Sequence, residues 1–164
     1  MRLFIAVTPD DKMKRALVDT MHDLKTQGTT GNFVPARNLH MTLAFIGECR
    51  ETETIRKIME EIPVEKARLS LAGFEYFGDV LTVGVKGNQK LKKYVSVLKN
   101  TLKENGIPCD MGKFEPHITL VRKVKGKRAA VPIPKEEMTI GRVSLMKSEQ
   151  KDGKTEYKEI FSVG

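Results

Sequence analysis

The sequence contains the pattern His-x-Thr-Leu twice, at residues 40–43 and at residues 117–120. The chain has only three histidines, so two independent accidents of this kind are improbable. Side chains at positions i and i+2 of a β-strand lie on one face, which places His40 beside Thr42 and His117 beside Thr119. Two such strands facing each other would bring two imidazoles and two hydroxyls to one point. The alternative interpretation is a pair of structural histidines on half-buried strands.

This set of side chains suits phosphodiester chemistry without a metal ion. Histidine titrates near pH ~6.5, so a neutral ring can take a proton from water while a charged ring gives one to a leaving oxygen. Threonine hydroxyls donate hydrogen bonds to phosphate oxygens without the cost of burying a charge. The sequence has no Gly-x-x-x-x-Gly-Lys phosphate loop, no zinc-type Cys/His spacing and no carboxylate set typical of magnesium-dependent nucleases. We therefore expect no metal and no cofactor.

The composition is that of a globular, basic protein. With 164 residues, 40% of them apolar and 30% charged, we expect residues 1–164 to form one domain with a real core. The formal net charge of +8 at pH 7 favours a polyanionic partner such as RNA or another phosphate compound. Nothing in the pattern requires a protein partner, and a monomer is expected.

The positive charge is concentrated in residues 86–128, where twelve lysines and arginines stand against three acidic residues. One group within this segment is interpreted as the solvated face of a helix: Lys90, Lys92, Lys93, Lys99 and Lys103. A second group surrounds the second histidine pattern, where it would attract an anionic substrate: Lys113, Arg122, Lys123 and Lys125.

The apolar stretches are far shorter than the ~20 residues of a membrane span, and the first residues lack the design of a signal peptide. The two cysteines, Cys49 and Cys109, are not arranged as a metal site or a disulfide framework. We expect a cytoplasmic protein that does not contact membranes.

Hydrophobic periodicity predicts three helices and seven strands. The first helix follows Thr8, the expected N-cap, with Pro9 at its first position, and ends near Gly28; the others cover residues 52–62 and 89–105. Strands are expected at residues 2–7, 39–46, 68–77, 80–85, 117–124, 139–146 and 157–163, with a short edge strand at 33–35 and loops at 29–32 and 125–134. Both halves read strand, helix, histidine strand. The pattern predicts an α+β fold of two pseudo-symmetric lobes in a single bilobal domain.

At these residues the sequence resembles the two-histidine phosphoesterase superfamily, specifically its LigT-like branch of RNA 2',3'-cyclic phosphodiesterases, also called 2'-5' RNA ligases. The resemblance rests on residues 1–6, 38–47 and 114–122. It implies two antiparallel-type sheets with helices outside and a central groove between them. It also implies metal-independent hydrolysis of a terminal 2',3'-cyclic phosphate, on RNA or a nucleotide, to a 2'-phosphate, and it allows reverse 2'-5' ligation. His117 is then the base and His40 the acid that protonates O3'.

Two further positions are carried over from this family. Arg122 lies five residues after His117, and Phe45 lies five residues after His40. In relatives these positions contact phosphate and stack on the terminal base. Strict strand alternation places both on the face opposite the histidines, so a bulge, a twist or a strand end is required. Phe45 is equally compatible with a place in the core, whereas an unpaired buried Arg122 would be costly.

The main alternative to an enzyme is a binding module that holds a nucleotide or RNA end in the same groove without turnover. The presence of both histidines and both threonines favours the enzyme, because a binder does not need two imidazoles. An RNA-recognition motif is excluded because its aromatic-rich strand is absent.

Overall fold

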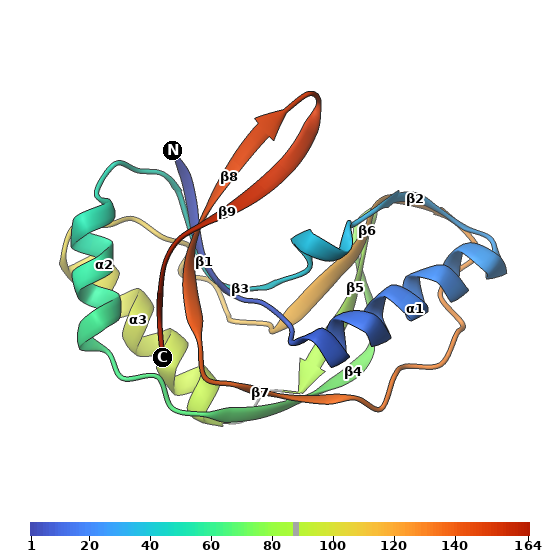
Figure 1. Cartoon of the computed structure of the whole chain (residues 1–164), viewed down its shortest axis with the longest axis horizontal. Helices are drawn as coiled ribbons and strands as arrows, with labels where there is room; N and C mark the ends of the chain where they lie inside the picture. The colour runs from blue at the N-terminus through green and yellow to red at the C-terminus, as the bar shows by residue number, and fades with distance from the viewer. Residues whose placement is uncertain (87–88) are drawn as a thin grey trace.

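The computed structural model describes residues 1–86 and 89–164 and shows two antiparallel sheets and three α-helices (Figure 1). The four-stranded sheet has the order β3 (Met41–Glu48), β1 (Arg2–Val7), β8 (Val143–Lys151), β9 (Lys154–Val163). The five-stranded sheet has the order β2 (Thr29–Phe33), β6 (His117–Gly126), β5 (Val80–Lys86), β4 (Ala67–Phe77), β7 (Glu137–Ile140). The prediction of an α+β fold with antiparallel sheets is confirmed.

The helices lie at opposite ends of the molecule. Figure 1 shows α1 (Asp11–Gln27) along the five-stranded sheet, and α2 (Thr52–Glu61) beside α3 (Gln89–Glu104) at the other end. The hairpin of β8 and β9 projects from the four-stranded sheet (Figure 1). Each sheet combines strands from both halves of the chain, because β2 joins the sheet of His117 and β8–β9 joins the sheet of β3. The two lobes are therefore not the two halves of the sequence.

Three expected boundaries are wrong. Helix α1 is capped by Asp10, whose Oδ1 accepts a hydrogen bond of 2.8 Å from the Met13 amide, and not by Thr8. Residues 29–32 are part of strand β2, whose polar sequence gives no strand signal and which forms by pairing with β6. That pairing also extends β6 to Gly126, into the loop expected at 125–134.

The strand expected at residues 139–146 is two strands in different sheets. β7 pairs with β4, and β8 pairs with β1, so the chain crosses between the sheets at residues 141–142. The last hairpin turns at residues 152–153, and its strand β9 begins at Lys154, earlier than the strand expected at 157–163.

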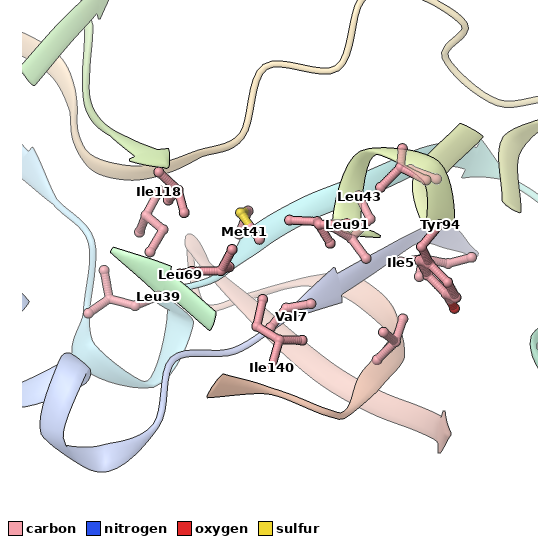
Figure 2. Close-up of a cluster of buried hydrophobic side chains, with 14 of the residues drawn as sticks. Ile5, Val7, Leu39, Met41, Leu43, Leu69, Leu91, Tyr94, Ile118 and Ile140 are labelled. Carbon is pink, nitrogen blue, oxygen red and sulfur yellow. The ribbon is translucent and has the colours of Figure 1, made fainter. Parts of the chain in front are cut away.

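The main core fills the space enclosed by the sheets and helices. It includes alternate residues of β1, such as Ile5 and Val7, together with side chains from β3, β4, β6 and α3 (Figure 2). The opposite face of β1 is also covered: Phe4, Ala6 and Met146 form a second small cluster against Tyr157. β1 is thus buried on both faces, and the second cluster lies next to His40 because the Phe4 ring contacts the His40 ring.

Lys99 is not part of a solvated helix face. It is 6% exposed, and its Nζ lies 3.1 Å from Oδ2 of Asp110, in the loop that leads to β6. The other carboxylate oxygen of Asp110 accepts the Phe45 amide at 2.6 Å, and the Asp110 amide donates to the Phe45 carbonyl at 3.0 Å. This ion pair therefore connects α3 and the segment before His117 to strand β3. The other four lysines of the group are exposed as expected.

Gly31 permits the close approach of β2 to β6. Its φ of +142° is favourable only for glycine, and a Cβ at this position would lie 2.8 Å from Val121 Cγ1 and 2.9 Å from the carbonyl oxygen of Arg122. The register of the β2–β6 pair shifts at this point, between Thr30 and Asn32.

We expect Gly31→Ala to lower the free energy of unfolding by about 1–3 kcal/mol, because the substitution adds backbone strain and a steric clash. Urea denaturation of the wild type and the variant measures this loss. Gly112→Ala is the control, since Gly112 has open space around its Cβ position and no positive φ. Equal stability of the two variants would contradict the steric argument.

Candidate active site

The two sequence-predicted histidines have the same backbone environment. His40 directly precedes β3, and His117 is the first residue of β6. His40 Nδ1 lies 2.8 Å from the carbonyl oxygen of Asn38, and His117 Nδ1 lies 2.7 Å from that of Glu115. A carbonyl oxygen can only accept, so in each neutral ring the proton is on Nδ1 and Nε2 is the free acceptor. Each imidazole is thus held with one nitrogen available for proton transfer.

Aromatic rings pack against both histidines. The His40 ring lies 5.0 Å from the ring of Phe4 and 5.0 Å from that of Tyr157, and the His117 ring lies 5.3 Å from Phe77. None of these three rings was expected at the site from the sequence. The only signal available was the scarcity of aromatic residues, which make up 6% of the chain.

The environment of His40 lowers its pKa below the usual value of 6.5. Burial of the ring is the largest cause, because it disfavours the charged imidazolium. The positive charges of Arg122 and of protonated His117 lower this pKa further, whereas the hydrogen bond with Asn38 opposes the shift. Both Arg122 and His117 therefore lie within electrostatic reach of His40, so the two patterns meet in space.

A β-bulge follows the threonine in each of the two strands. In β3, Ala44 and Thr42 pair with consecutive residues of β1, which leaves Leu43 as the extra residue. In β6, Val121 and Thr119 pair with consecutive residues of β5, which leaves Leu120 as the extra residue. Each bulge places two apolar residues in succession in the core and reverses the alternation beyond it.

The bulges bring Arg122 and Phe45 to the histidine side of the strands, as the sequence argument required. Phe45 pairs with Phe4, whose ring contacts His40, and side chains of directly paired residues share a face. Phe45 is 42% exposed, so it is not a core residue. The guanidinium of Arg2 lies 5.6 Å from the centre of its ring.

A cavity of about 560 Å³ lies between the two sheets and contains three of the predicted site residues: His40, Thr119 and Arg122. Its other walls are strand β2, the short 3-10 helix Ala36–Asn38 and the β8–β9 hairpin. Thr42 lies on the same side of β3, since it pairs with Ala6 of the small apolar cluster. His117, Thr42 and Phe45 do not line this cavity. Lys123 and Lys125 line a separate cavity of about 490 Å³, which shares Asn32 with the first.

The part of the chain that the structure describes was expected to hold neither a metal site nor a membrane span, and two findings concern these points. Within residues 1–86 and 89–164, no three His, Cys, Asp or Glu side chains are grouped in a way that could hold a metal ion. In the same part of the chain, no helix is long and apolar enough to cross a membrane.

The sequence matches the family model of the 2'-5' RNA ligase superfamily over residues 9–152, and the chain belongs to this superfamily. Among curated relatives, an RNA 2',3'-cyclic phosphodiesterase of Thermotoga maritima is 31% identical over 74% of this chain and 70% of its own length. An RNA 2',3'-cyclic phosphodiesterase of Archaeoglobus fulgidus is 31% identical over 80% of this chain and 77% of its own length.

Solved structures share the fold. Escherichia coli LigT superposes with a TM-score of 0.87 at 22% identity, covering 99% of this chain and 95% of LigT. A Thermus thermophilus protein superposes with a TM-score of 0.83 at 26% identity, over 99% of this chain and 96% of that protein. The family and the fold that the sequence predicted are confirmed.

We expect Tyr157→Ala to raise the pKa of His40 toward 6.5, because the substitution admits water to a ring whose pKa is lowered mainly by burial. An NMR titration of the His40 ring protons in both proteins measures the change. Phe77→Ala is the matched control, since Phe77 packs on His117 and not on His40. The explanation fails if Tyr157→Ala leaves the pKa of His40 where it was.

Proposed function

We propose that this chain is an RNA 2',3'-cyclic 3'-phosphodiesterase, which hydrolyses the terminal 2',3'-cyclic phosphate of an RNA or a nucleotide to a 2'-phosphate. Curated relatives are named RNA 2',3'-cyclic phosphodiesterase, and two of them match at 31% identity. The observation that carries the proposal is the pair of histidines whose Nδ1 atoms are both held by backbone carbonyls, next to a cavity with Thr119 and Arg122.

The reaction assigns one proton transfer to each histidine. Neutral His117 takes a proton from water, the water oxygen attacks phosphorus, and the bond between phosphorus and O3' breaks. His40, in its protonated form, gives its proton to O3', so the products are a 2'-phosphate and a free 3'-hydroxyl. Thr42 and Thr119 donate hydrogen bonds to the non-bridging oxygens, and Arg122 balances the developing negative charge. Both proton transfers are supplied by side chains of this chain, and the proposal therefore requires no metal.

The lowered pKa of His40 in the free protein sets a condition on this assignment. An acid must be protonated when the substrate is bound, and burial disfavours that form. The cyclic phosphate is an anion, and an anion beside an imidazole favours the charged ring. The proposed role of His40 thus depends on the substrate raising its pKa.

The same geometry suits 2'-5' ligation, which is the reverse of cleaving a 2'-5' phosphodiester. A 5'-hydroxyl of a second RNA end in place of water would lose its proton to His117 and form a 2'-5' phosphodiester. LigT, which shares the fold, has been crystallised with 3'-AMP and with phosphate. Nucleotides and phosphate are accordingly the ligands that we propose for the cavity here.

We further propose that residues 1–164 act as a single catalytic unit. The cavity takes its walls from β2, from the segment before β3, from β6 and from β9. Both sheets, through residues between 32 and 157, are thus needed to build it, and the cavity does not require a second subunit.

We expect the protein to convert a 2',3'-cyclic mononucleotide to the 2'-phosphate with EDTA present, at an unchanged rate. His40→Ala and His117→Ala each remove one proton transfer and should lower kcat about 10²–10⁴-fold. Thr42→Val and Thr119→Val remove only a hydrogen bond and should cost roughly 10–10³-fold. Phosphorus NMR of the product distinguishes the 2'-phosphate from the 3'-phosphate.

His22→Ala is the control, because His22 is exposed on α1 and lies outside the cavity. A wild-type protein that binds the cyclic nucleotide without product would make the chain a binding module for nucleotide or RNA ends. A His40→Ala protein that retains most of its rate would remove the two-histidine mechanism.

We expect the dependence of kcat on pH to be bell-shaped, because one imidazole must be neutral and the other charged. The two limbs report apparent pKa values of the pair. Steady-state rates from about pH 5 to 9 measure the profile. Arg122→Gln should move the limb that reports His40 to higher pH, because the Arg122 charge lowers the pKa of His40. A profile with one limb would contradict the use of two titrating groups.

A further inference from the structure

The cavity contains more positive charge than one cyclic phosphate requires. Three cations line it, Arg122, Arg37 and Lys154, and no described aspartate or glutamate does. Arg122 lies with Thr119 on β6 and is used in the proposed reaction. Arg37, before β3, and Lys154, at the start of β9, have no part in that reaction.

Arg37 and Lys154 are free to bind an external anion. Both side chains are exposed. Neither forms an ion pair with any carboxylate in the part of the chain that the structure describes. Two solvated cations in a cavity with no negative group create a positive potential at that end, which attracts a phosphate.

One hydrogen bond joins the two backbone segments that carry these cations. The side-chain amide of Asn38 donates to the carbonyl of Thr155 at 2.9 Å, and Asn38 is 6% exposed. Arg37 directly precedes Asn38, and Lys154 directly precedes Thr155. The bond therefore holds their backbones together, although 117 residues separate its two partners.

The hairpin turn and the histidine strengthen this arrangement. Asp152 and Gly153 have φ values of +52° and +74°, which is the conformation of a tight two-residue turn that matches strand twist. The turn leads directly into Lys154, the first residue of β9. The carbonyl of Asn38 also accepts from His40 Nδ1. The backbone segments that carry the two cations are thus linked to each other and to the carbonyl that orients His40.

We propose that Arg37 and Lys154 bind the phosphate on O5' of the terminal nucleotide, the group that joins this nucleotide to the rest of the RNA. The inference rests on the proposed function and deepens it. A terminal RNA nucleotide carries two anionic groups, the cyclic phosphate and the phosphate on O5'. With the first at His40 and Thr119, the second is the anion available to the remaining cations. RNA ends are then preferred over cyclic mononucleotides that lack a 5'-phosphate.

The test compares two substrates, a dinucleotide with a 2',3'-cyclic phosphate end and the matching 2',3'-cyclic mononucleotide without a 5'-phosphate. We expect Arg37→Gln and Lys154→Gln each to lower the ratio of their kcat/KM values, dinucleotide to mononucleotide, by about tenfold, the usual scale for one charge-assisted contact to phosphate. Lys57→Gln is the matched control, since it removes one exposed cation on α2, outside the cavity, and should leave the ratio unchanged.

Two results would overturn the proposal. An unchanged ratio in both variants would show that neither cation contacts the phosphate on O5'. Equal losses on the two substrates would place the cations at the cyclic phosphate instead. Both side chains are exposed, so misfolding is not expected to obscure the comparison.

A binding measurement keeps this test separate from the test of the enzyme. Calorimetric titration compares adenosine 2',5'-bisphosphate with adenosine 2'-monophosphate. We expect the wild type to bind the bisphosphate about tenfold or more tightly, and each variant to reduce this difference. This outcome supports the subsite even if neither cyclic substrate is turned over, which would refute the proposed function alone. Equal affinities of the two nucleotides for the wild type would refute the subsite.

Discussion

One extra residue after the threonine of each histidine strand determines which of the following side chains share the histidine side of that strand. A regular strand would direct Arg122 and Phe45 into the core, where an unpaired guanidinium costs several kcal/mol. The bulges at Leu43 and Leu120 each add an apolar side chain to the core and return the next polar or exposed residue to the histidine side of the strand. The same irregularity thus serves packing on one face and the site on the other, at equivalent places in the two sheets.

The histidines depend on short-range hydrogen bonds, whereas the walls of the cavity depend on long-range ones. Each imidazole is oriented by a carbonyl only two residues earlier in the chain, so the orientation accompanies the local backbone. The opposite wall comes from the β8–β9 hairpin, which the buried amide of Asn38 connects to the segment before β3. Asn38 therefore takes part in both: its backbone orients His40, and its side chain holds the hairpin.

Positive charge has two effects in this cavity. Arg122 lowers the pKa of His40 in the free protein, and together with Arg37 and Lys154 it favours an anionic ligand. A bound phosphate offsets that charge and favours the protonated imidazole again. In the proposed mechanism, substrate binding would therefore be coupled to the protonation of His40, through Coulomb interactions and through the desolvation of a ring that Phe4 and Tyr157 cover.

Features with a local period or spacing could be predicted from the sequence. These features depend only on residues that are close along the chain. They are the His-x-Thr pairs, the apolar faces of the helices, the left-handed Gly28 after α1 and the turn at residues 152–153. Tertiary structure decided the rest: strand β2, the split of residues 139–146 between two sheets, the burial of Lys99 against Asp110, and the rings of Phe4, Tyr157 and Phe77 at the histidines. Strand partners and ion pairs connect residues far apart in sequence, and no period of two or 3.6 residues encodes which distant segment supplies the partner.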